Sequence, residues 1–129
     1  MNQPLPPTVA GSRLFVEDKV HDEVVERLVD RTRRLVPGDP LDPKTRLGAL
    51  VSEKQRESVL GYVETGRREG ARVAHGGEPA TVGGKGWFMQ PTVLDGVNND
   101  MTVAREEIFG PVVVVIPFQI GRASCRERV

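Results

Sequence analysis

The chain has 129 residues, of which 38% are hydrophobic and 28% are charged, a composition that is typical of one soluble globular domain and excludes a disordered chain. Its 18 basic and 18 acidic residues cancel, so no net charge directs the protein toward nucleic acid or an anionic membrane. No apolar run is long enough to span a membrane, and the single cysteine forms neither an intramolecular disulfide nor, with two distant histidines, a metal site. A reducing, cytoplasmic location is therefore expected.

The first part of the chain is predicted to form a strand followed by a helix. Residues 12–16 alternate in character and carry Leu, Phe and Val, as a strand does. Asp18 can cap the helix that follows, and Pro37 with Gly38 ends it. The apolar residues at helical spacing, which we expect on the buried face, are Val20, Val24, Val25, Leu28 and Leu35.

A second helix is predicted after a Pro- and Asp-rich connection at residues 38–49. Ser52 stands three residues before Gln55, which is the capping-box pattern that opens a helix. Gly70 is a natural C-terminal stop. The expected core face consists of Val59, Leu60 and Val63.

Strand and helix patterns continue to alternate to the end of the chain. The predicted elements are a strand at 71–74, a flexible glycine-rich loop at 76–86, an extended segment at 92–94, a short helix at 102–106 and a strand at 112–118. Asp100 can cap the short helix. The last strand is almost wholly apolar, as in a parallel sheet covered on both faces, and we expect its covering helices to lie outside this chain. The alternation predicts an α/β fold with a mostly parallel sheet flanked by helices.

The most informative segment is Ala-Arg-Glu-Glu-Ile-Phe-Gly-Pro-Val at residues 104–112, which leads into the last predicted strand. It holds an acid and an aromatic ring at the mouth of a buried strand, where a ligand can meet both. A carboxylate suits a ribose diol, because its two oxygens accept hydrogen bonds from both hydroxyls and its charge strengthens each bond. The alternative is that Glu106 and Glu107 are a solvated pair at a helix end and that Phe109 is a plain core residue.

This segment resembles the E-E-x-F-G-P signature of the NAD(P)-dependent aldehyde dehydrogenase family. Three further stretches resemble segments of the same family in the same order. They are Ala-Gly-Ser-Arg-Leu-Phe-Val at 10–16, Gly-Asp-Pro-Leu-Asp-Pro at 38–43 with Leu-Gly-Ala-Leu-Val-Ser at 47–52, and Gly-Lys-Gly-Trp-Phe at 84–88 leading to Pro-Thr-Val at 91–93. Residues 10–118 are thus identified as part of the catalytic domain of that family.

The resemblance implies a parent enzyme that oxidises a small-molecule aldehyde to a carboxylic acid with NAD or NADP and that forms a homo-oligomer. In the family a cysteine thiolate attacks the aldehyde, and a thiohemiacetal and then a thioester follow. The second glutamate of the signature accepts hydrogen bonds from the nicotinamide ribose, and its phenylalanine packs beside the nicotinamide. Those roles fall on Glu107 and Phe109, which we therefore expect to bind the cofactor.

Gln55 is a third candidate for the cofactor site. Its family counterpart reaches toward the adenosine-side ribose of the dinucleotide. The competing interpretation is local, because Gln55 belongs to the capping box with Ser52 and its amide would satisfy a backbone donor. We favour the capping role slightly. For His21 and His75, which lie on a charged helix face and in a loop, we expect solvated side chains.

The two ends of the chain depart from the family pattern. The nucleophilic cysteine of the family would stand at Thr8, so no catalytic residue is predicted, and residues 1–9 do not match the family. Residues 120–129 resemble the translated adapter oligonucleotide of short-read DNA sequencing, so we expect residues 119–129, with Cys125, to be an artefact rather than a natural basic tail. We expect a fragment that is inactive by itself; the alternative is a non-catalytic module that binds a nucleotide or a partner.

Overall fold

The computed structural model describes residues 12–121, and the expectations for Thr8, Cys125 and the flanking segments 1–11 and 122–129 lie outside the described residues. Its helices and strands, in chain order, are β1 Arg13–Glu17, the 3-10 turn η1 Asp18–Val20, α1 His21–Arg33, α2 Glu53–Glu69, β2 Arg72–His75, β3 Pro79–Ala80, β4 Phe88–Met89, β5 Thr92–Asp95, α3 Thr102–Arg105 and β6 Val112–Phe118. Within this described part, none of the helices combines the length and the apolar character needed to cross a bilayer.

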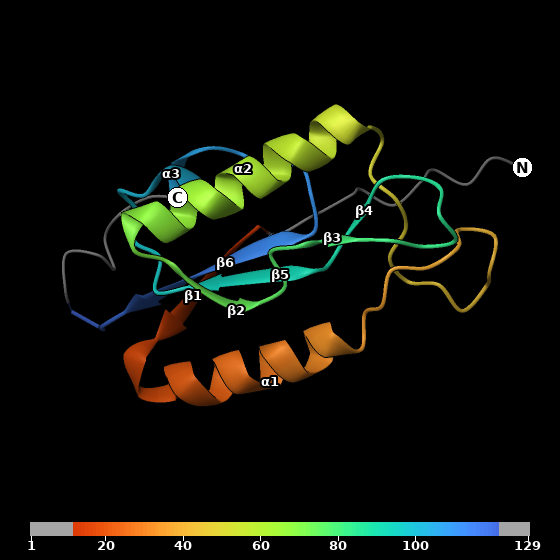
Figure 1. Ribbon diagram of the computed structural model, residues 1–129. Coiled ribbons are helices and arrows are strands. Elements are labelled where there is room, and N and C mark those ends of the chain that lie inside the picture. The colour runs from red at the N-terminus through yellow and green to blue at the C-terminus, as the bar shows by residue number, and fades with distance from the viewer. Residues whose placement is uncertain (1–11, 122–129) are drawn as a thin grey trace, which may run out of the picture.

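Four strands form one mixed sheet in the order β1-β6-β5-β2 (Figure 1). β6 lies parallel to both β1 and β5, while β2 runs antiparallel to β5 at one edge. Thr92 pairs with Val112, so β5 and β6 begin side by side. The prediction of an α/β fold with a mostly parallel sheet is confirmed.

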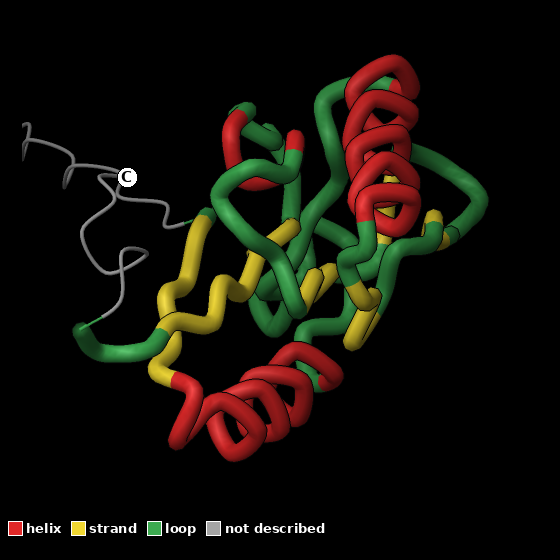
Figure 2. The backbone as a smooth tube through the Cα atoms, turned by 90° about the vertical axis from the view of Figure 1, so that its left-hand side faces the viewer, coloured by secondary structure: helices red, strands yellow, loops and turns green. Residues whose placement is uncertain are grey.

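Helices cover both faces of this sheet. α1 lies on one face and α2 with α3 on the other, and a view turned by 90° places the strands between α1 and α2 (Figures 1 and 2). β6 contributes alternate residues to the two sides, as a pleated strand does. Its Val112, Val114 and Ile116 belong to the core cluster of α2, whereas Val115 belongs to that of α1.

The helices that cover β6 come from the described chain itself. Val59 of α2 and Val25 of α1 are both buried, at 2% and 5% exposure. The expectation that the covering helices lie elsewhere is therefore wrong. Parallel strands need a long crossover between them, and the crossover from β1 to β6 carries both helices.

α2 begins and ends where local chemistry predicts. The Ser52 hydroxyl accepts a hydrogen bond from the Gln55 backbone N–H at 3.1 Å. Gly70 ends the helix with φ +109°, a left-handed conformation that glycine adopts without a steric penalty. Val59 and Val63 are buried on the core face, as predicted.

α1 differs from its prediction at both ends. Asp18 lies in η1, and the N-cap position is Val20, whose side chain makes no capping hydrogen bond. Asp18 does not cap the helix because the 3-10 turn moves the first helical turn three residues along the chain. The helix ends at Arg33, before Leu35, which is 37% exposed, while Val20 at the other end is 44% exposed. The predicted apolar face is therefore buried only in its middle part.

α3 is capped by a distant carboxylate and not by Asp100. The backbone N–H and the hydroxyl of Thr102 each donate to the Glu69 carboxylate at 2.7 Å. The Asp100 N–H instead donates to the Asn98 side chain in the preceding turn. The Thr102 hydroxyl, followed by its backbone N–H, holds the pKa of Glu69 below its ordinary value. The prediction failed because 33 residues separate the cap from the helix that it caps.

The glycine-rich segment 76–86 is more ordered than a plain loop. It contains β3, in which Pro79 pairs with Met89 of β4. At Gly76, φ is +74° and an added Cβ would meet the Pro91 carbonyl oxygen at 2.3 Å. The prediction of a flexible loop is therefore incomplete, because the segment opens with a close backbone contact that only glycine permits.

Candidate functional site

The loop between α3 and β6 presents an acid and an aromatic ring to solvent. Glu106 ends α3, with its N–H donating to the Thr102 carbonyl at 2.9 Å. Ile108 is buried and anchors the loop in the core. Its neighbours Glu107 and Phe109 are both exposed, and Phe109 leaves 67% of its surface open. The alternative that Phe109 is a core residue is therefore wrong.

Close contacts fix this loop against α2 and β5. A Cβ added at Gly110 would lie 2.7 Å from Cγ2 of Val59 in α2, so only glycine fits at this approach. The Gly110 N–H donates to the Ile108 carbonyl at 3.0 Å, which makes a tight turn. The Pro111 carbonyl then accepts a hydrogen bond from the Thr92 N–H at 2.8 Å. Glu107 and Phe109 thus project from a backbone that is packed on α2 and bonded to β5.

Gln55 connects the first turn of α2 to this loop. Its Oε1 accepts a hydrogen bond from the Val51 N–H at 2.9 Å, and its Nε2 donates to the Phe109 carbonyl at 2.7 Å. The predicted capping role is confirmed, because the amide satisfies a backbone donor next to Ser52. The bond to Phe109 was not predicted.

Gln55, Glu107 and Phe109 line two adjoining open hollows. One, of about 580 Å³, lies between the loop and segment 47–51, and the other, of about 430 Å³, lies between the loop and α2. The structure therefore brings together the three residues that the sequence predicted for a cofactor site, although 54 residues separate Gln55 from Phe109.

The two hollows combine chemically different groups around one opening. The Glu107 carboxylate accepts hydrogen bonds and suits a ligand with paired hydroxyls. The exposed Phe109 ring offers a face for a flat ring. Lys54 and Ser58 of α2 add a cation and a hydroxyl to the smaller hollow. Among residues 12–121, no three His, Cys, Asp or Glu side chains are grouped so that they could hold a metal ion.

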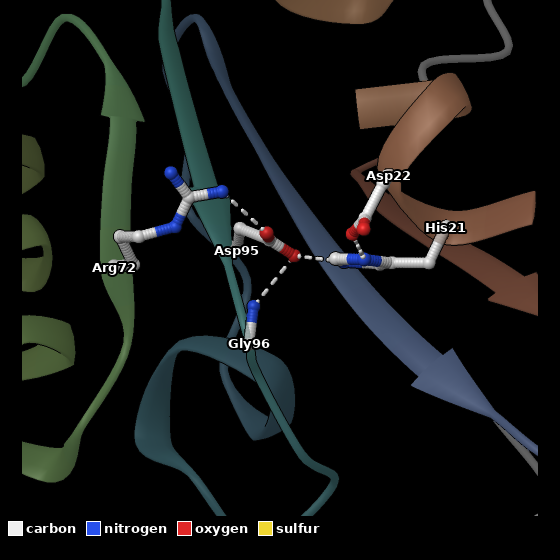
Figure 3. A network of polar contacts seen from close by, with 5 residues as sticks. All are labelled: His21, Asp22, Arg72, Asp95 and Gly96. Atoms are coloured by element: carbon white, nitrogen blue, oxygen red, sulfur yellow. Dashed lines mark hydrogen bonds and ion pairs between the residues drawn. The ribbon is translucent and has the colours of Figure 1, made fainter. Parts of the chain in front are cut away.

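A second polar arrangement lies where β5 ends beside the start of α1 (Figure 3). The Asp95 side chain is only 4% exposed, and its carboxylate accepts hydrogen bonds from Arg72 Nη2 at 2.8 Å and from the Gly96 N–H at 2.7 Å. His21 Nε2 lies 2.7 Å from the same carboxylate, and His21 Nδ1 lies 2.9 Å from Asp22. These five residues are named the Asp95 cluster.

The geometry of the Asp95 cluster favours a charged imidazole at His21. Both ring nitrogens face carboxylate oxygens, and both can donate only when the ring is protonated. The hydrogen bond to Asp95, followed by that to Asp22, accordingly raises the pKa of His21 above its ordinary value. Burial alone would raise the pKa of Asp95, but the hydrogen bonds from His21, Arg72 and Gly96 together lower it. Charge-assisted bonds therefore join α1, β2 and β5.

The expectation of solvated histidines is wrong. The His21 side chain is 20% exposed, because α1 begins beside the end of β5. His75 is half-buried, and its Nδ1 lies 2.9 Å from the Pro91 carbonyl oxygen. The sequence held one signal for the missed cluster, since Asp95 closes an apolar strand and needs a partner there. Arg72 lies directly opposite it in the antiparallel register.

Comparison with known proteins supplies the family context for these surfaces. Residues 8–123 match the model of the aldehyde dehydrogenase family. A betaine aldehyde dehydrogenase from Rhizobium etli is 51% identical over 123 residues, which are 91% of this chain and 25% of that protein. The corresponding enzyme from Brucella anthropi is 50% identical over 124 residues, which are 91% of this chain and 26% of that protein. The chain thus spans about a quarter of the length of the curated relatives that it matches.

Solved structures share the arrangement of helices and strands. An aldehyde dehydrogenase from Bacillus cereus, in its NAD+ complex, matches with a TM-score of 0.78 and 50% identity, over 84% of this chain and 22% of that chain. An aldehyde dehydrogenase from Pseudomonas aeruginosa matches with a TM-score of 0.83 and 42% identity, over 89% of this chain and 23% of that chain. At these identities the likeness extends from the fold to the sequence.

Proposed function

The chain belongs to the aldehyde dehydrogenase family, and from that premise we propose that it supplies the nicotinamide-ribose part of a cofactor site in an enzyme that oxidises an aldehyde to a carboxylic acid with NAD+ or NADP+. The observation that carries the proposal is the position of Glu107 and Phe109 on one loop, both exposed around the same two hollows.

The groups on this loop fit a nicotinamide nucleotide. The Glu107 carboxylate is exposed and accepts hydrogen bonds, as the two hydroxyls of a ribose require. The Phe109 ring offers an apolar face that would cover one side of the nicotinamide and exclude water there. When bound, NAD(P)+ supplies the acceptor for the hydride that leaves the substrate.

The part of Gln55 in the cofactor site is restricted by its existing bonds. Its Oε1 bonds to the Val51 N–H, and one of the two Nε2 hydrogens goes to the Phe109 carbonyl. The second Nε2 hydrogen is the group through which Gln55 would reach a ribose without leaving its place. We therefore propose that Gln55 makes at most one hydrogen bond to the adenosine-side ribose.

The remaining catalytic parts are proposed to lie outside this chain. The family nucleophile corresponds in position to Thr8, so we propose that the chain by itself does not oxidise aldehydes. The parent enzyme is proposed to be a cytoplasmic homo-oligomer. Similarity to betaine aldehyde dehydrogenases makes betaine aldehyde the first substrate to assay.

A chimera tests the proposal. Residues 12–121 replace the corresponding quarter of the Rhizobium etli relative, and NADH formation is followed with betaine aldehyde as substrate. Glu107→Gln should lower kcat/KM by about 5- to 30-fold, because a charge-assisted hydrogen bond worth roughly 1–2 kcal/mol is weakened.

The adjacent glutamate provides a matched control. Glu106 is also exposed but lines neither hollow, so Glu106→Gln should leave the kinetics unchanged. Equal effects of the two substitutions would contradict the assignment of Glu107 to the ribose. A folded but inactive chimera would instead favour a non-catalytic module.

A further inference from the structure

We infer that Gln55 is a positioning residue, whose amide holds the Phe109 backbone and thereby sets the direction in which Glu107 and Phe109 face a nicotinamide nucleotide. The inference rests on the proposed function of that loop. It differs from direct cofactor binding, because the side chain acts here through the loop and keeps its bonds when a ligand binds.

The two side-chain bonds of Gln55 leave its amide little freedom. Oε1 accepts from the Val51 N–H at 2.9 Å and Nε2 donates to the Phe109 carbonyl at 2.7 Å. The amide is planar, so bonds at both of its ends select one orientation of the group. Gln55 therefore connects segment 47–51 to residues 106–111, the loop between α3 and β6, which we name the Phe109 loop. These two segments line the larger hollow.

The helix that carries Gln55 is itself firmly placed. Val59 and Val63, one and two turns further along α2, are 2% and 1% exposed. The Ser52 hydroxyl caps the same turn through the Gln55 N–H at 3.1 Å. A side chain on this turn can therefore transmit the rigidity of the core to a surface loop.

The Phe109 loop needs such a connection because its functional side chains are not held by burial. Phe109 is 67% exposed and Glu107 is exposed as well. Their neighbours Ile108 and Gly110 are fixed by the core and by Val59. The bond from Gln55 fixes the peptide that lies between these two anchors, and so it fixes the point from which the Phe109 ring projects.

The test uses the full 129-residue chain, with backbone hydrogen exchange and signal shifts measured by NMR and nicotinamide mononucleotide as the probe. Gln55→Glu keeps an acceptor for the Val51 N–H but removes the donor to Phe109. A carboxylate is favourable in the first turn of a helix, so this variant should fold. Gln55→Met is neutral and removes both bonds, and Ser58→Ala, on the same helix and the same smaller hollow, is the control.

We expect Gly110 N–H exchange to be about 2- to 10-fold faster in Gln55→Glu and in Gln55→Met, as for the loss of one hydrogen bond. Val51 exchange should be faster only in Gln55→Met, and Ser58→Ala should change neither. The mononucleotide should shift the Glu107 and Phe109 signals of the unchanged chain, bind both Gln55 variants more weakly, and leave Val51 protected in the complex.

Two results would overturn the inference. One is unchanged Gly110 exchange in both Gln55 variants. The other is loss of Val51 protection when the mononucleotide binds, which would mean that the Gln55 amide leaves Val51 and bonds to the ligand instead. A third result separates the two proposals. If the mononucleotide shifts no signal of the unchanged chain while both variants loosen Gly110, the proposed function fails and the positioning of Phe109 by Gln55 is supported.

Discussion

The Phe109 loop and the Asp95 cluster both gather polar groups, but they are built in opposite ways. In the loop, nearly consecutive residues stand exposed around two hollows. In the cluster, 74 residues separate His21 from the carboxylate of Asp95, which is 4% exposed. Water can replace a lost partner in the loop but not at the Asp95 carboxylate, which would remain buried without a partner. Exposure thus leaves the groups of the loop available to a ligand, whereas burial commits the Asp95 carboxylate to the fold.

The largest effect should come from Asp95→Asn. The substitution removes the charge, and the one amide nitrogen of asparagine meets other donors in either orientation. At the Oδ2 position it would face Arg72, and at the Oδ1 position it would face His21 and the Gly96 N–H. Breaking a buried ion pair is costly, but Arg72 is 66% exposed and water can reach it. We therefore expect a loss of about 2–3 kcal/mol in the free energy of unfolding, measured by urea denaturation.

Asp22→Asn is the control for this substitution. Asp22 bonds to the same imidazole, but its side chain is fully exposed, so water replaces the lost contact. The urea midpoint should hardly change. If both substitutions destabilised the protein equally, burial would not be what distinguishes the cluster.

The contrast between local and distant partners also explains what the sequence predicted. Ser52 and Gly70 were identified as the ends of α2, because a capping box and a C-terminal glycine act within one helical turn. The E-E-x-F-G-P segment was identified for the same reason, since its groups are neighbours in the chain. The groups of the Phe109 loop were thus accessible to sequence analysis, but its contacts with Gln55, Val59 and Thr92 were not.

The parts that were missed depend on topology. The Glu69 cap of α3 and the contact between His21 and Asp95 join residues that are 33 and 74 positions apart. Asp18 and Asp100 looked like better caps only because they were near. A local pattern cannot indicate which turn or strand end will lie against a helix terminus, and the order β1-β6-β5-β2 decides this.

Gly110→Ala should have the second largest effect on the free energy of unfolding, and it tests whether the loop is fixed against α2. The new Cβ would lie 2.7 Å and 2.9 Å from the two methyl carbons of Val59. Overpacking of this kind costs about 1–3 kcal/mol, measured by the same urea denaturation. An unchanged stability would mean that the loop moves away from α2 easily, and the loop would then not be fixed.

A smaller effect should appear in the pH dependence of the free energy of unfolding, to which His21 and Asp95 of the Asp95 cluster contribute. The pKa of His21 is raised above 6.5. The stability that the protonated imidazole contributes is therefore fully present below pH 6.5 and is lost as pH rises through the raised pKa. The pKa of Asp95 is lowered below 3.8, so its contribution is present above pH 3.8 and is lost as pH falls through the lowered pKa. The stability from this pair is therefore greatest between these two ordinary values.

His21→Gln isolates the histidine part. The variant should lack the decline on the alkaline side, while its acid-side decline remains because Arg72 and Gly96 still bond to Asp95. Urea midpoints of both proteins from about pH 2.5 to about pH 9 check both declines. Parallel profiles would show that the His21 contact does not contribute to stability.

The smallest effect is expected from Glu69→Ala, which tests whether an exposed carboxylate behaves like the loop or like the cluster. Glu69 accepts two bonds from Thr102, but water can replace it at the start of α3. Hydrogen exchange across Thr102–Arg105 should become faster with little change in the urea midpoint. Glu64→Ala is the control on the same helix, since Glu64 bonds to Arg67 and not to α3.

The effect of Glu69→Ala should also depend on pH. Because folding lowers the pKa of Glu69 below 4.5, the difference in hydrogen exchange between the variant and the unchanged chain should be present above pH 4.5 and disappear as pH falls through the lowered pKa. A midpoint shift as large as that of Asp95→Asn would show that the distance between partners along the chain, and not burial, determines how much a polar contact stabilises this fold.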